Sequence, residues 1–199
     1  MSTLVIATNN RGKATEYEEM LSPYGIKIKT LGDFDVDFEI NENGQTFTEN
    51  ASIKAKTVMR KLDLPVMADD SGLVVDVLEG EPGVHSARYA GDHDDDANNK
   101  KLLAELKGVP EEKRTAHFHT TIVALKPNGQ ELVTNGRVDG RILLAPRGKN
   151  GFGYDPLFFV DSFGRSMAEL TSEEKNSISH RGQALRKFME HFEEWWAAE

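Results

Sequence analysis

Two adjacent aspartates, Asp69 and Asp70, have the clearest potential for chemistry in this sequence. They follow a short, mainly apolar run at residues 64–68 that is typical of a buried strand, and Ser71 and Gly72 come directly after them. We expect the strand to end there in a turn that holds both carboxylates at the rim of a sheet. Such a position suits a divalent cation, or a water that must lose a proton. An ordinary acidic turn is the alternative.

A candidate anion site follows the first expected strand. Residues 8–13, Thr-Asn-Asn-Arg-Gly-Lys, connect a strand expected over residues 4–8 to a helix expected over residues 13–21. The N–H groups at a helix start, the flexible backbone of Gly12 and the charge of Lys13 together suit a phosphate. The segment is not a Walker A loop, because alanines occupy two positions that this pattern requires. An ordinary strand-to-helix turn is the alternative.

Two later segments suit the other parts of a nucleotide. Residues 151–156, Gly-Phe-Gly-Tyr-Asp-Pro, place Phe152 between two glycines, which would leave a ring face free to stack on a base. Lys175, His180 and Arg181 supply donors that suit carbonyl oxygens or phosphates. A structural turn and an ordinary charged surface are the respective alternatives.

Composition restricts the class of protein. The chain has 199 residues and a net charge of −9. It has no cysteine, which excludes disulfides, thiolate nucleophiles and cysteine-bound metals. The acidic balance argues against nucleic-acid partners, although a few lysines and arginines in one cleft can hold a small phosphorylated ligand. We find no apolar run that could span a membrane and no export signal, so we expect a cytoplasmic protein.

Hydrophobic periodicity predicts a single α/β domain over residues 1–199 with a mixed sheet. The expected helices cover residues 13–21, 46–62, 96–106 and 182–197. The expected strands cover residues 4–8, 25–31, 34–40, 66–68, 73–78, 117–125, 131–138 and 157–160. A hairpin turn is expected at residues 127–129, Pro-Asn-Gly.

Two other metal patterns fail. Asp92, Asp94 and Asp96 have the spacing of the first EF-hand ligands, but the glycine and the closing glutamate of that loop are absent. His117 and His119 share a strand face without a visible third ligand, so zinc is not expected.

Six blocks in order resemble the inosine triphosphate pyrophosphatase family, in its bacterial dITP/XTP pyrophosphatase branch. The blocks lie at residues 8–13, 47–55, 68–73, 82–91, 151–156 and 179–182. The resemblance implies an elongated mixed sheet flanked by helices, with two lobes and the active-site cleft between them. It also implies a homodimer and a magnesium-dependent hydrolysis of ITP, dITP and XTP to the monophosphate and pyrophosphate, which cleanses the nucleotide pool.

The resemblance also implies roles for individual residues. Glu42 and Asp70 would hold Mg²⁺, and Asp70 would also be the proton acceptor; the sequence alone does not decide whether Asp69 or Asp70 is the base. Residues 8–13 would bind the triphosphate, and the later residues of the set below, from Ser71 onward, would contact the nucleotide. The implied substrate-binding residues are Thr8, Asn9, Asn10, Arg11, Gly12, Lys13, Ser71, Phe152, Gly153, Tyr154, Asp155, Lys175, His180 and Arg181.

Two other functions remain open from the residues. One is a sensor that binds deaminated purine nucleotides without turning them over. The other is a dimeric aspartic protease, since residues 70–72, Asp-Ser-Gly, are similar to the catalytic turn of that class. The adjacent carboxylates favour an enzyme over a sensor. Lys13, Lys54 and Lys175 would have no role in a protease.

Overall fold

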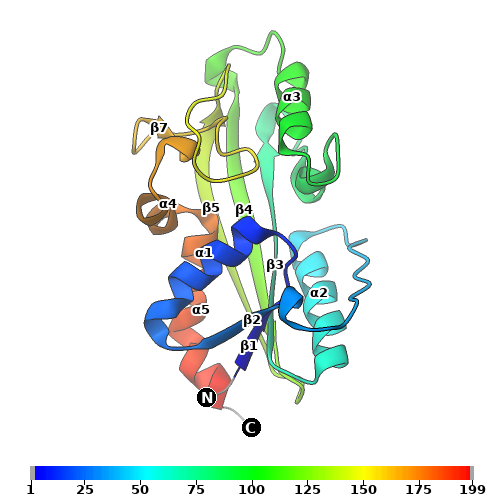
Figure 1. Cartoon of the computed structure of the whole chain (residues 1–199). Helices are drawn as coiled ribbons and strands as arrows, with labels where there is room; N and C mark the ends of the chain where they lie inside the picture. Colours follow the sequence, from blue (N-terminus) through cyan, green and yellow to red (C-terminus); the bar gives the residue numbers. More distant parts are fainter. Residues whose placement is uncertain (1–2, 198–199) are drawn as a thin grey trace. The chain divides into compact units, whose positions relative to one another are not determined.

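The computed structural model describes residues 3–197 and contains a seven-stranded sheet in the order β2-β1-β3-β4-β5-β6-β7 (Figure 1). The strands are β1 (Thr3–Ile6), β2 (Lys27–Thr30), β3 (Val66–Val75), β4 (Thr115–Leu125), β5 (Glu131–Ile142), β6 (Phe158–Val160) and β7 (Arg165–Ser166). The α-helices are α1 (Arg11–Leu21), α2 (Phe47–Leu62), α3 (Asp95–Glu105), α4 (Ser172–Ile178) and α5 (His180–Ala197). β1 pairs in parallel with β2 and β3, whereas β6 pairs antiparallel with β5 and β7, so the predicted α/β fold with a mixed sheet is confirmed.

The chain divides into two compact units. Unit 1 consists of the residues up to Asp70, of Thr120–Gly136 and of the residues from Arg181 onward. Unit 2 consists of Ser71–His119 and Arg137–His180. Strands β3, β4 and β5 therefore each contribute one part to unit 1 and the other part to unit 2.

Unit 1 is a sheet covered by helices on both faces. Alternate residues of β1, β3 and β4 pack against α1 and α5 on one face, where Tyr17 and Phe188 are fully buried. The intervening residues of the same strands pack against α2, whose Ala51, Ala55 and Val58 are fully buried. This two-sided burial explains the nearly continuous apolar sequence of β1.

Unit 2 has its own core. It is built from the end of β3, the beginning of β4 and the end of β5 together with α3, and Leu73, Leu102 and Phe158 are fully buried in it. Local sequence signals fix its helices. The Asp94 side chain caps α3 by accepting from the Ala97 N–H, and Thr171 forms a capping box with Glu174 at the start of α4.

Two predictions about strands are wrong. The expected turn at residues 69–72 does not form, because β3 runs without a break from Val66 to Val75. Met67 and Leu73 are both fully buried, each in the core of a different unit, and a single extended segment places both. Residues 34–40 form no strand; Phe34, Phe38 and Ile40 pack against the α2 face of unit 1, which accounts for their alternation without strand pairing.

No helix among residues 3–197 combines the length and apolarity that crossing a bilayer would require.

Candidate active site

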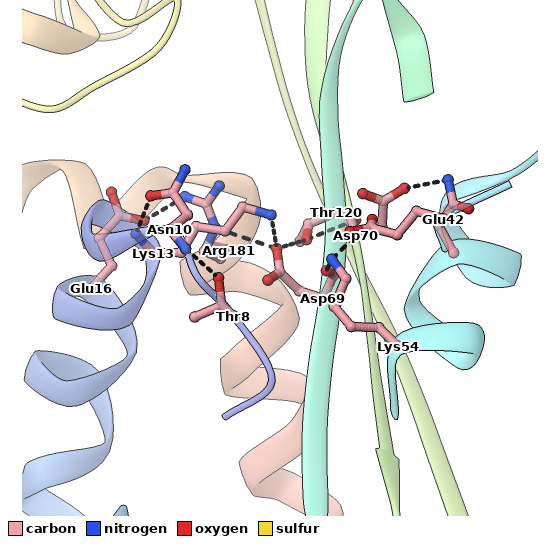
Figure 2. Close-up of polar contacts among 11 residues, drawn as sticks. Thr8, Asn10, Lys13, Glu16, Glu42, Lys54, Asp69, Asp70, Thr120 and Arg181 are labelled. Carbon is pink, nitrogen blue, oxygen red and sulfur yellow. Dashed lines mark hydrogen bonds and ion pairs between the residues drawn. The ribbon is translucent and has the colours of Figure 1, made fainter. Parts of the chain in front are cut away.

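Asp69 and Asp70 lie on opposite faces of β3, because successive side chains of a strand alternate. Their apolar neighbours show the same alternation: Met67 belongs to the α1 and α5 side of unit 1, and Ala68 to the α2 side. Both carboxylates are almost fully buried. The two adjacent carboxylates therefore meet different partners, and they are able to do different chemistry (Figure 2).

Asp69 lies at the centre of a buried ion-pair cluster. Its Oδ2 atom accepts from Lys13 Nζ at 2.8 Å and from Thr120 Oγ1 at 3.4 Å, and it lies 3.7 Å from Arg181 Nε. Arg181 in turn forms an ion pair with Glu16 of α1 (Figure 2). Two cations and two carboxylates thus balance one another in a region nearly closed to water.

Asp70 faces α2, where a neutral amide, rather than a lysine, donates a hydrogen bond to its carboxylate. Its Oδ2 atom accepts from Asn50 Nδ2 at 3.1 Å. The same amide accepts through Oδ1 from the Gly44 N–H at 2.8 Å, so Asn50 joins the segment that carries Glu42 to the strand that carries Asp70. Lys54 completes this side by pairing with Glu42 at 3.1 Å and by donating to the Asp69 carbonyl at 2.9 Å.

The two aspartates differ in proton affinity. Burial would raise the pKa of Asp69, but the charges of Lys13, Arg181 and Lys54 outweigh it and lower this pKa to about 2. Burial raises the pKa of Asp70 to about 6, because Lys13, Lys54 and the Asn50 bond only partly oppose it and Glu42 adds to it. Asp70 is therefore the carboxylate suited to accept a proton near neutral pH, and Asp69 is suited to remain a fixed anion.

The carboxylates that face α2 fit a magnesium ion. Glu42 is close enough for its charge to raise the pKa of Asp70, and a cation between two such groups would relieve that repulsion. Among residues 3–197 there is no cluster of three or more potential metal-ligating His, Cys, Asp or Glu side chains. This donor set suits Mg²⁺, which is commonly held by one or two carboxylates together with substrate phosphates and water.

The segment at residues 8–13 forms the start of α1. The Asn10 side chain caps the helix by accepting from the Lys13 N–H, and the Asn10 N–H donates to Thr8 Oγ1. Asn9 and Arg11 are exposed, and Gly12 is half-buried. Lys13 reaches from this first turn to Asp69, so the predicted phosphate segment and the aspartates lie in one unit.

Replacing Lys13 with alanine should weaken binding of a nucleoside triphosphate and also destabilise the fold. The change removes a cation from the helix start and leaves Asp69 without its nearest partner. Steady-state kinetics with dITP should show a raised KM, and the melting temperature should fall. An unchanged KM would argue against a phosphate-binding role for Lys13.

A second group of predicted residues gathers in unit 2, around residues 151–156. Asp155 Oδ2 accepts from the Phe152 N–H at 3.0 Å and from Lys175 Nζ at 2.5 Å. Lys175 Nζ also lies 4.8 Å from the centre of the Phe152 ring. The Tyr154 hydroxyl donates to the Ser86 carbonyl at 2.8 Å. Phe152, Asp155 and Lys175 of α4 are therefore joined by direct contacts, and Tyr154 of the same loop bonds instead to Ser86.

His180 and Ser71 also fall in unit 2, whereas Arg181 falls in unit 1. The ring of His180 is buried and stacks on Phe118, with ring centres 4.9 Å apart. Burial lowers the pKa of Arg181, but Glu16 and Asp69 raise it more, so the guanidinium stays charged. His180 and Arg181 are adjacent in the sequence, but they belong to different units and contact different residues.

Sequence reasoning missed several residues that support the site. Asn50 and Lys54 are four positions apart on one face of α2, and this spacing was a signal, but solvation is the default for such residues. Glu16 and Thr120 gave no signal, because their roles depend on partners 165 and 51 residues away in sequence.

Known proteins are similar to this chain along nearly its whole length. Residues 4–191 match the Ham1 family. A dITP/XTP pyrophosphatase of Lactiplantibacillus plantarum is 65% identical over 195 residues, which cover 98% of this chain and 96% of that protein. The solved HAM1 protein of Coxiella burnetii aligns with a TM-score of 0.87 at 43% identity, over 98% of this chain and 100% of that one. The Staphylococcus aureus Ham1 protein aligns with a TM-score of 0.86 at 39% identity, over 96% and 98% of the two chains. The resemblance seen in the sequence is confirmed, and the chain belongs to the Ham1 family.

Proposed function

We propose that this chain hydrolyses deaminated purine nucleoside triphosphates, among them dITP, ITP and XTP, to the nucleoside monophosphate and pyrophosphate. The names of its relatives support this substrate class. The observation that carries the reaction type is the pair of buried aspartates on opposite faces of β3, of which only Asp70 has a pKa raised to about 6. A protein that only bound phosphate would not need a buried carboxylate that is ready to take a proton.

In the proposed mechanism, Asp70 orients a water molecule and takes its proton. The water oxygen forms a bond to the α-phosphorus, the bond from that phosphorus to the bridging oxygen breaks, and pyrophosphate leaves. The start of α1 and Lys13 hold the phosphates, whose total charge of about −4 an acidic protein must offset. Mg²⁺ held by Glu42 and Asp70 would neutralise part of that charge.

The residues of unit 2 are proposed to bind the nucleoside. Phe152 supplies a ring that can stack on the purine, and Lys175 and His180 supply donors. Inosine and xanthosine carry a carbonyl at C6, where adenosine carries an amino group. A buried donor would meet another donor if adenine entered the site, so adenine should be rejected.

Product analysis with dITP, dATP and dGTP tests the proposal. With Mg²⁺ we expect dITP to yield dIMP and pyrophosphate, with dATP and dGTP nearly unchanged and almost no turnover in the presence of EDTA. Release of orthophosphate would place the attack at the γ-phosphorus and contradict the mechanism. Tight binding of dITP without turnover would instead identify a sensor.

We propose that the protein acts in the cytoplasm, where the nucleotide pool is, and that it is a homodimer. Light scattering in solution measures the second point directly.

A further inference from the structure

Gly153 is held by α3 at both of its backbone polar groups. Its N–H donates to Asp95 Oδ2 at 2.7 Å, and its carbonyl accepts from Asn99 Nδ2 at 2.8 Å. Asp95 and Asn99 are four positions apart, so they lie on the same face of the helix. The Asn99 amide also donates to the Asp95 carbonyl at 2.8 Å, which orients it. We call Asp95 and Asn99 the Gly153 clamp.

The clamp acts on a backbone conformation that favours glycine. Gly153 has a φ of +62°, and an added Cβ would meet no atom within 4 Å, so the glycine is needed for its conformation and not for space. A glycine that is not held visits many conformations. Gly151, on the other side of Phe152, also has a left-handed φ of +73°. Asp155 holds the N–H of Phe152 itself, and the clamp adds contacts at Gly153 to those that set the direction of the Phe152 ring.

The helix that carries the clamp is anchored by hydrogen bonds of its own. Asn98, which lies between its two residues, is 2% exposed and accepts through Oδ1 from the Ala90 N–H at 2.6 Å and the Gly91 N–H at 3.2 Å. The Asp94 side chain caps the helix. Rigid elements hold a site more precisely than loops do, so α3 is able to fix the loop that carries Phe152.

We propose that Asp95 and Asn99 are positioning residues for base recognition, which act through Gly153 to hold Phe152 in the orientation that stacks on the purine. This inference rests on the proposed function. The clamp residues bond the backbone of Gly153 and have no proposed contact with substrate. Their effect is to preorganise the loop, so that binding of the base need not order it.

The test is steady-state kinetics with dITP for Asp95→Ala, Asn99→Ala and the double variant. We expect the double variant to raise KM about tenfold while kcat changes less than about twofold, since the clamp favours ground state and transition state alike. A clamp that only stabilised the fold would lower the active fraction and hence kcat, with KM unchanged. Asp95→Asn keeps an acceptor oxygen, so its KM should return toward the wild-type value.

Asp96→Ala is the matched control, because it removes the same charge from the first turn of α3 at an exposed side chain. A KM change in this control equal to that of Asp95→Ala would overturn the clamp, as would clamp variants with wild-type KM. Wild-type protein that fails to hydrolyse dITP would refute the proposed function, and the role of the clamp with it. Failure of the clamp alone leaves wild-type turnover intact, so the two failures are distinguishable.

Discussion

Asp70→Asn should abolish hydrolysis of dITP and leave the folded protein more stable at pH 8. An amide cannot take the proton of the attacking water, and a lost general base commonly costs about 10²–10⁴-fold in rate. The oxygen of the substituted amide would still accept a hydrogen bond from Asn50, so the local structure should persist.

The stability gain follows from the pKa of Asp70. Burial raises this pKa to about 6 in the folded chain, whereas an unfolded aspartate has a pKa of about 3.9. The folded state therefore binds more protons between these values, and the free energy of unfolding falls as pH rises through this window. Above about pH 6 the full penalty is present, up to about 3 kcal/mol, and asparagine removes it.

Melting temperatures in EDTA at pH 4 and pH 8 measure this effect. The variant should exceed the wild type at pH 8, and the difference should shrink at pH 4, where the Asp70 carboxyl is protonated in the folded chain. A variant that retains more than about a tenth of the wild-type kcat would remove Asp70 from the base role.

Asp69→Ala should have the opposite effect on stability, although the residue is the immediate neighbour of Asp70. The change leaves Lys13 and Arg181 buried without the carboxylate between them. Removing one partner of a buried ion pair typically costs about 3–5 kcal/mol. Urea unfolding at pH 7 should show a lower midpoint with an unchanged slope.

Asp139→Ala is a suitable control for this measurement, because it makes the same change in an exposed pair with Arg137. Pairs of this kind contribute about 0–1 kcal/mol, so its midpoint should stay near that of the wild type. Equal midpoints for the two alanine variants would mean that the Asp69 cluster adds no net stability.

Local pattern was enough to predict most of the elements. The apolar spacing of residues 46–62 predicted the start and end of α2 to within one residue, and Pro127-Asn128-Gly129 marked the β4–β5 hairpin. The short helix α4 was missed. The pattern failed where tertiary packing decides, at residues 34–40 and at residues 69–72. In the second case Ser71 and Gly72 are common in turns, but burial on both sides of them keeps the strand extended.

The residues of the candidate site also fall into those that a local motif predicts and those that depend on tertiary contacts. The sequence marked the acidic pair, the start of α1 and the Phe152 loop, since each is a contiguous motif. It did not decide between Asp69 and Asp70, because their difference arises from partners on α1, α2 and α5. The contacts near Glu42 form only in the fold, where Lys54 pairs with it and Asn50 bonds to Gly44 of the same segment.

The uninterrupted course of β3 limits which insertions and deletions the protein can tolerate. Side chains of a strand alternate with a period of two, so one inserted or deleted residue between Val66 and Asp69 would exchange the faces of the two aspartates. An insertion would move Asp69 to the position beside Asn50, and a deletion would move Asp70 to the position beside Lys13, so either change would leave one of the two positions without its carboxylate. We therefore expect substitutions to be tolerated along this segment more readily than any change in its length, and insertions to accumulate instead in connecting loops.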